Sequence, residues 1–262
     1  GKNIGYMVPA PVINHFLKDI GDGKFDGTPC LGVSYQEMEN PDIRLKYNMS
    51  EEQTGILVNK TYLGTPARGV LKPGDIILSI EDKNIENDGT IEFRKDERTF
   101  FEYVLQNKYI GDTIKLKILR ESEITNIELK LSAPLNLWKL VHYEQYDVAP
   151  TYYILGGLVF EPLTKNFLET WGGGWYNNAP TNLLNYYYYE DPADDRREIV
   201  VLVKVLADEI NVGYHDWRYN VISSVNGKKV SNMKDLVNAF ENLRGKYHII
   251  EDTQGNKIVL DK

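Results

Sequence analysis

A ten-residue stretch occurs twice in this chain, and the repetition limits the possible folds more than any other feature. Residues 76–85 read Ile-Ile-Leu-Ser-Ile-Glu-Asp-Lys-Asn-Ile and align without gaps with residues 221–230, which read Val-Ile-Ser-Ser-Val-Asn-Gly-Lys-Lys-Val. Each copy is typical of a strand, a turn and a second short strand. Self-similarity of this kind indicates two copies of one domain. The length of 262 residues is about what two ordinary domains need.

Short apolar segments bounded by Gly, Pro, Asn and Asp predict further strands around the first copy. They cover residues 31–35, 55–60, 75–80, 113–119 and 125–131. Apolar residues four apart predict one helix in each half, from about Asp96 to Gln106 and from Asn232 to Leu243. Many short strands with few helices indicate the α+β class. We therefore expect two small, partly open antiparallel β-barrels or sandwiches capped by helices.

The first 25 residues differ from the strand-rich segment that follows them. Residues 3–9 form a short apolar run that ends at Pro9, which suits a strand whose sheet partners lie outside this chain. Helical spacing from Val12 to Ile20, after Pro11, predicts a connecting helix. We expect the first domain at 26–133, a linker at 134–149 and the second domain at 150–262. The second domain carries an insertion at 162–197 that is rich in Trp, Tyr, Gly and Asn.

Composition excludes several classes of function. The net charge of −8 argues against nucleic acid as a partner, because phosphate binding needs clustered Lys and Arg. The longest uncharged stretch, Thr170 to Tyr189, contains Gly, Asn and Pro, so we expect no membrane segment. Peptides or proteins suit this chain better as partners.

Catalytic and metal-binding patterns are not found in the sequence. No serine has glycines on both sides as a hydrolase nucleophile would require. The four histidines share no metal-ligand spacing, and Cys30 has no CxxC partner, so we expect neither a cofactor nor a metal. The aromatic residues of the insertion, Tyr186 to Tyr189 with Trp171 and Trp175, fit a partner interface and internal packing equally well.

Three segments resemble PDZ domains of the HtrA/Deg serine proteases. Residues 71–80, Leu-Lys-Pro-Gly-Asp-Ile-Ile-Leu-Ser-Ile, are similar to the family signature L-x-x-G-D-x-I-x-x-(I/V). Residues 30–33, Cys-Leu-Gly-Val, resemble the family's carboxylate-binding loop. Residues 3–9 resemble the last protease strand, so residues 1–25 would be the end of a protease domain and a connecting helix. Residues 87–90 and 150–153 are most similar to the plant-type Deg branch.

The resemblance implies that a peptide adds as a strand beside the loop. The implied binding residues are Leu31, Gly32, Val33, Ser34, Tyr35, Arg98, Phe101 and Leu105. In this interpretation Phe101 and Leu105 line the pocket for the last ligand side chain, and Arg98 reaches the ligand carboxylate. The alternatives are that Gly32 only relieves a turn, that Phe101 and Leu105 are core residues, and that Arg98 is a solvated charge.

The second copy departs from the signature, because Tyr219-Asn220 stands where the first has Gly74-Asp75 and its loop reads Gly156-Gly157-Leu158. The sequence therefore predicts a degenerate second domain with a role in assembly or regulation. The resemblance implies a trypsin-like endopeptidase as the parent, with unfolded or C-terminal peptides, its own protease domain and trimer-based homo-oligomers as partners. It favours a periplasmic compartment, with an organelle as the alternative. A non-proteolytic PDZ scaffold or adaptor is the competing function.

Overall fold

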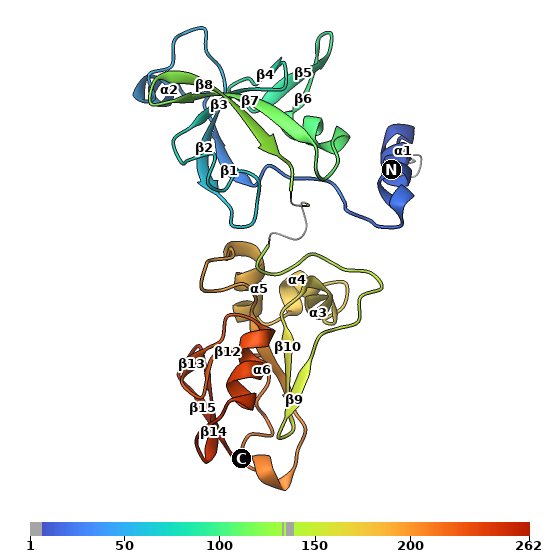
Figure 1. The fold of residues 1–262 in the computed structure, drawn as a ribbon, viewed down its shortest axis with the longest axis vertical. Helices are drawn as coiled ribbons and strands as arrows, with labels where there is room; N and C mark the ends of the chain where they lie inside the picture. Colours follow the sequence, from blue (N-terminus) through green and yellow to red (C-terminus); the bar gives the residue numbers. More distant parts are fainter. Residues whose placement is uncertain (1–6, 133, 135–138) are drawn as a thin grey trace. The chain divides into compact units, whose positions relative to one another are not determined.

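A computed structural model describes residues 7–132, 134 and 139–262. The chain separates into two compact units, residues 1–138 and residues 139–262 (Figure 1). Each unit is built around an antiparallel sheet that remains open at its edges.

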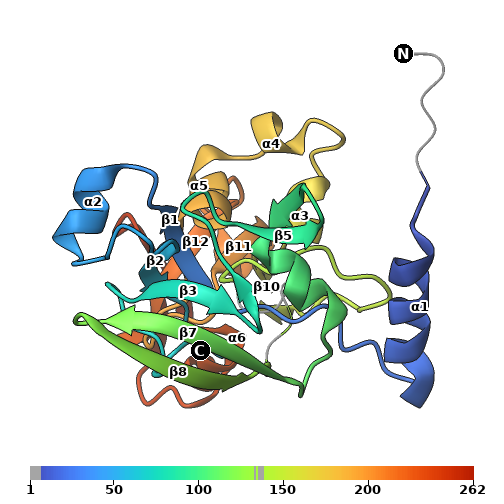
Figure 2. The ribbon, with the colours of Figure 1, turned by 90° about the horizontal axis from the view of Figure 1, so that it is seen from above.

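The first unit contains one main sheet and one small hairpin. Its elements are α1 (Ala10–Asp19), η1 (Ile20–Asp22), β1 (Val33–Glu37), α2 (Pro41–Lys46), β2 (Ile56–Thr61), β3 (Ile76–Ile80), β4 (Lys83–Asn84), β5 (Thr90–Arg94), β6 (Glu97–Phe100), η2 (Phe101–Asn107), β7 (Thr113–Arg120) and β8 (Glu123–Lys130). The main sheet has the order β1-β2-β3-β7-β8 (Figure 2). Strand β4 pairs with β3, and β5 and β6 form a separate two-stranded sheet among the described residues.

Strand β3 lies at the centre of the first unit and is buried along its whole length. One face of the sheet packs on a core that includes Ile77, Ile80, Phe101 and Leu105. The other face packs on a smaller cluster with Ile76 and Leu78. Burial on both faces explains why β3 reads as a continuous apolar run instead of an alternating pattern.

The expected helix from Asp96 to Gln106 is wrong in its first half. Residues 97–100 form β6, which pairs with β5, and the helical segment η2 begins only at Phe101. The chain reverses at Asp96, whose φ of 64° lies in the left-handed region that a short polar residue tolerates. The spacing of Phe101 and Leu105 does mark a helical turn, but a tight hairpin precedes it.

The second unit repeats the topology of the first. Its elements are β9 (Tyr153–Leu155), β10 (Leu158–Pro162), α3 (Lys165–Glu169), α4 (Trp175–Asn178), α5 (Thr181–Tyr189), β11 (Val200–Val205), η3 (Glu209–Asn211), β12 (Asn220–Val225), β13 (Lys228–Lys229), α6 (Met233–Glu241), β14 (Tyr247–Asp252) and β15 (Lys257–Asp261). The sheet order β10-β11-β12-β14-β15 matches β1-β2-β3-β7-β8, and β13 pairs with β12 as β4 does with β3. The repeated stretch therefore forms the same strand, turn and strand in each unit.

Helix α6 agrees with the sequence prediction. Asn232 caps it, because its side chain accepts a hydrogen bond from the backbone N–H of Asp235 at 2.8 Å. Leu236 and Phe240 are buried against the sheet. Helix α1 also agrees, and Gly23, with a φ of 85°, ends the turn that follows it.

The insertion forms a second core inside the second unit. Leu168 from α3 and Leu183 from α5 are fully buried in this cluster, with Trp175 and Tyr187 packed against it. Leu140 and Val141, from the segment expected to be a linker, are buried in the same cluster. Part of the aromatic run thus packs internally, whereas Tyr189 is 80% exposed.

A strand was expected at residues 3–9, and residues 3–6 of that segment lie outside the described residues. From Met7 to Pro9 the chain has no regular structure. Helix α1 contacts the rest of its unit through His15, whose ring stacks on Tyr109 at 4.2 Å between centroids. In the part of the chain that the structure describes, no helix has the length and apolar character needed to cross a membrane.

Candidate functional site

The loop at residues 30–33 is held in place by the segment at residues 62–67. The carbonyl oxygen of Gly32 accepts hydrogen bonds from the backbone N–H of Tyr62 at 2.9 Å and from the Thr65 hydroxyl at 3.2 Å. The carbonyl oxygen of Leu31 accepts one from the N–H of Ala67 at 3.1 Å. Gly32 has a φ of 79°, and a Cβ atom there would overlap the Thr65 side chain. Only glycine fits this position without strain.

A cavity of about 190 Å³ lies where this loop, β1 and η2 meet. Most of its walls are apolar. Of the predicted site residues, the structure brings together Leu31, Gly32, Val33, Tyr35, Phe101 and Leu105 around this cavity. Phe101 and Leu105 also belong to the core of the unit, so the core-packing interpretation is correct, and the ligand-pocket interpretation stays a prediction.

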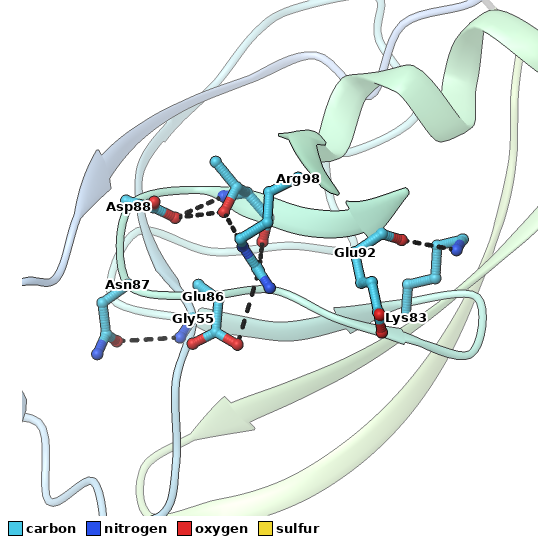
Figure 3. A network of polar contacts seen from close by, with 8 residues as sticks. Gly55, Lys83, Glu86, Asn87, Asp88, Glu92 and Arg98 are labelled. Atoms are coloured by element: carbon cyan, nitrogen blue, oxygen red, sulfur yellow. Dashed lines mark hydrogen bonds and ion pairs between the residues drawn. The ribbon is translucent and has the colours of Figure 1, made fainter. Parts of the chain in front are cut away.

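The structure places Ser34 and Arg98 elsewhere. Ser34 lies next to a β-bulge in β1 and is not among the residues that line the cavity. Arg98 lies on β6, where its guanidinium donates to the Thr90 hydroxyl at 2.7 Å and to the Thr90 carbonyl at 2.9 Å. Figure 3 shows the same guanidinium reaching toward Glu86, with 3.6 Å between charged atoms. Arg98 therefore holds the hairpin of β5 and β6 together. The expectation that it reaches a ligand carboxylate depended on a helix from Asp96 to Gln106, whereas Arg98 lies on strand β6.

Cys30, the first residue of the predicted loop, and Glu102, which the sequence did not predict as a site residue, also line the cavity. The Cys30 thiol is buried, and burial raises its pKa to about 11, so it stays protonated at neutral pH. Glu102 accepts a hydrogen bond from the Tyr35 hydroxyl at 2.8 Å across the cavity. Glu102 directly follows Phe101, but no periodic pattern marks a lone acidic residue that faces an apolar cavity.

The outer edge of β1 borders the cavity, and no strand of the described residues pairs with it. The equivalent edge in the second unit, on β10, is covered by β9 in an antiparallel pairing. Tyr153 of β9 stacks on Phe240 of α6 at 5.7 Å between ring centroids. Gly156 and Gly157 form the tight turn of this hairpin, so the presumed binding loop of the second unit connects two paired strands.

The Gly-Asp pair of the signature is structural. Asp75 is 2% exposed, and its two carboxylate oxygens each accept a hydrogen bond from Arg120 at 2.7 Å. Gly74 supplies the turn, with a φ of 97°. This bidentate pair ties β3 to the end of β7.

The second unit keeps the geometry of this pair with different residues. Tyr219 takes the place of Gly74, with a φ of 62°. Asn220 takes the place of Asp75 and donates to the buried carboxylate of Asp252 at 3.0 Å. An amide–carboxylate pair thus stands where the first unit has an ion pair.

The site offers no cluster of metal ligands. Within the described ranges, no group of three or more His, Cys, Asp or Glu side chains is placed to hold a metal ion. What the arrangement can do chemically is bind an extended chain along the free edge of β1.

Comparisons with known proteins agree with this geometry. Models of the PDZ domain match residues 29–131 and residues 141–262. Protease Do-like 2, chloroplastic, from Arabidopsis thaliana is 34% identical over 100% of this chain and 42% of its own length. Protease Do-like 4, mitochondrial, from the same plant is 35% identical over 91% of this chain and 43% of its own length.

Two weaker similarities were also found. A serine protease DegP homolog from Plasmodium falciparum is 23% identical over 92% of this chain and 38% of its own length. The solved structure described as HtrA-type protease AlgW with decapeptide is 24% identical, with 50% of this chain and 37% of that chain covered and a TM-score of 0.35. The chain thus spans less than half the length of the curated relatives it matches. It belongs to the PDZ family, as a pair of PDZ domains similar over their whole length to the PDZ region of HtrA/Deg proteases.

Proposed function

We propose that the first unit binds peptides as an added strand along β1, with the ligand's C-terminal carboxylate at the loop of residues 30–33. The observation that carries this proposal is the unpaired edge of β1 beside an apolar cavity. In strand addition, backbone hydrogen bonds supply affinity and the pocket supplies selectivity. The carbonyl groups of Leu31 and Gly32 are engaged with residues 62–67, which keeps two negative dipoles away from an incoming carboxylate.

The same proposal extends to the longer protein. We infer that this chain is the peptide-capturing part of a serine endopeptidase and has itself a binding role. Its partners would be unfolded or C-terminal peptides and its own protease domain, within a trimer-based homo-oligomer. The names of the curated relatives support this inference, and so does the fraction of their length that the chain covers. The second unit would serve assembly or regulation, since β9 already covers the edge of β10.

The test is binding of fluorescent peptides to the whole chain, measured by anisotropy. Each peptide has an apolar last residue and carries either a free C-terminal carboxylate or an amide. We expect the carboxylate form to bind with a micromolar dissociation constant, about −8 kcal/mol, and the amide at least about tenfold more weakly, because one charge-assisted contact is lost.

A pair of variants locates the binding site. Val33→Glu places a negative charge in the cavity wall beside the proposed carboxylate site and should abolish binding. Ile124→Glu makes the same kind of change on β8, where Ile124 is 52% exposed, and should leave binding intact. Both variants are first checked for an unchanged thermal unfolding midpoint. Equal binding of the carboxylate and the amide, or equal effects of the two variants, would contradict the proposal.

A further inference from the structure

One carboxylate oxygen of Glu102 has no hydrogen-bond partner among the residues that the structure describes. Its Oε1 accepts the hydrogen bond from Tyr35, whereas Oε2 is enclosed and has no hydrogen-bond partner among the described residues. No ion pair joins Glu102 to a Lys or Arg in this part of the chain. Burying a carboxylate oxygen without a donor costs free energy that a later partner can recover.

Tyr35 cannot satisfy both oxygens. Its ring packs edge-on against Phe101, at 5.1 Å between centroids, and its hydroxyl has a single proton to donate. Burial raises the pKa of the Tyr35 phenol, as do the hydrogen bond to Glu102 and the negative charges of Glu102 and Glu37. The phenol therefore stays neutral and donates its one proton to Glu102.

The position of Glu102 along the groove decides which ligand residue it meets. This step rests on the proposed strand addition. In an added strand, alternate side chains face the same wall, about 6.8 Å apart. Tyr35 lies two residues beyond Val33 on β1, and Glu102 lies three residues before Leu105 on η2. A ligand whose last side chain lies near Leu31 and Leu105 would therefore bring the residue two places earlier beside Tyr35 and Glu102.

We propose that Glu102 makes the first unit selective for peptides with Lys or Arg two residues before the C-terminal residue. An ammonium or guanidinium group supplies several donors and a positive charge, and charge-assisted hydrogen bonds are about twice as strong as neutral ones. A ligand hydroxyl would offer one donor and no charge. The incoming cation shares or replaces the hydrogen bond that Tyr35 now makes.

The experiment compares three peptides on the unmodified whole chain. They share an apolar last residue and differ only two residues earlier, where they carry Lys, Thr or Ala. We expect the Lys peptide to bind at least about tenfold more tightly than the Ala peptide, with Thr between them. The Lys advantage should shrink as salt is raised, because part of it is Coulombic.

Glu102→Gln tests the residue itself. The amide keeps the shape and an acceptor for Tyr35 but removes the charge, so the ratio of Lys-peptide affinity to Ala-peptide affinity should fall to about twofold or less. Glu123→Gln, the same chemical change on exposed β8, should keep the full Lys advantage.

Each other result has one meaning. Three peptides with equal affinities would overturn the selectivity of Glu102 and leave the groove proposal standing. A Thr peptide that binds more tightly than the Lys peptide would show that the site prefers a neutral hydroxyl donor to a cation. That result would also overturn the proposed selectivity of Glu102. If no peptide binds, the groove proposal fails and the selectivity falls with it.

Discussion

At Gly32 the backbone and its neighbour leave no room for a side chain. A φ of 79° strains any L-residue, and a Cβ would also overlap Thr65. We expect Gly32→Ala to lower the free energy of unfolding of the first unit by about 2–4 kcal/mol, measured by urea unfolding and far-UV circular dichroism. Gly64 has nearly the same φ, 78°, and open space around it, so Gly64→Ala should cost only about 1 kcal/mol. Equal costs would show that the overlap with Thr65 is relieved easily.

The ion pair of Asp75 and Arg120 gives a second residue-scale prediction. Arg120→Met should lower the free energy of unfolding by about 3 kcal/mol, because it leaves the Asp75 carboxylate buried without its cation. Arg94→Met removes an exposed partner of Glu97 and should change stability by less than about 0.5 kcal/mol. Guanidinium unfolding curves of the two variants compare these costs. A similarly small loss of unfolding free energy in both variants would mean that water replaces the hydrogen bonds that Arg120 donates to Asp75.

The largest difference between the two units at the scale of elements is strand β9. Tyr153 packs toward Phe240, whereas its neighbour Ile154 is 48% exposed. We expect Tyr153→Ala to destabilise the second unit by about 1–3 kcal/mol more than Ile154→Ala, since only Tyr153 loses a stacked ring and buried area. Urea unfolding followed by tryptophan fluorescence measures both. Equal effects would mean that the backbone pairing alone holds β9.

Sequence patterns predict some elements better than others for physical reasons. The repeat at residues 76–85 and 221–230 predicts its strands correctly because the burial of these segments is encoded in consecutive apolar residues. The hairpin of β5 and β6 was missed because its reversal depends on one backbone angle at Asp96. The cavity could be predicted from Gly32 and the spacing of Phe101 and Leu105. Glu102 could not, because its partner Tyr35 is 67 residues away along the chain.

The whole molecule should respond to pH unevenly. His248 is 7% exposed, and burial, with a smaller contribution from Lys262, lowers the pKa of its ring in the folded state below 6.5. Below about pH 6.5 the unfolded chain therefore binds a proton that the folded second unit does not, and the free energy of unfolding falls as pH falls.

Tryptophan fluorescence reports mainly on the second unit, because Trp171, Trp175 and Trp217, three of the four tryptophans, lie in it. We expect the fluorescence-detected melting temperature to drop between pH 7.5 and 5.5, and His248→Phe to reduce that drop while keeping an aromatic ring against Phe240. An unchanged drop in His248→Phe would assign it to other groups.

Tandem copies of one fold risk exchanging strands with each other while they fold. The polar pair at the start of β3 bears on this risk. The first unit has an ion pair of Asp75 and Arg120 there, and the second unit has a pair of Asn220 and Asp252 at the equivalent position. If β3 were to pair with β14, Asp75 would meet the buried carboxylate of Asp252, and two like charges would be enclosed together. The correct pairings bring Asp75 to Arg120 and Asn220 to Asp252. The divergence between the copies would therefore disfavour the exchange of strands between the two sheets.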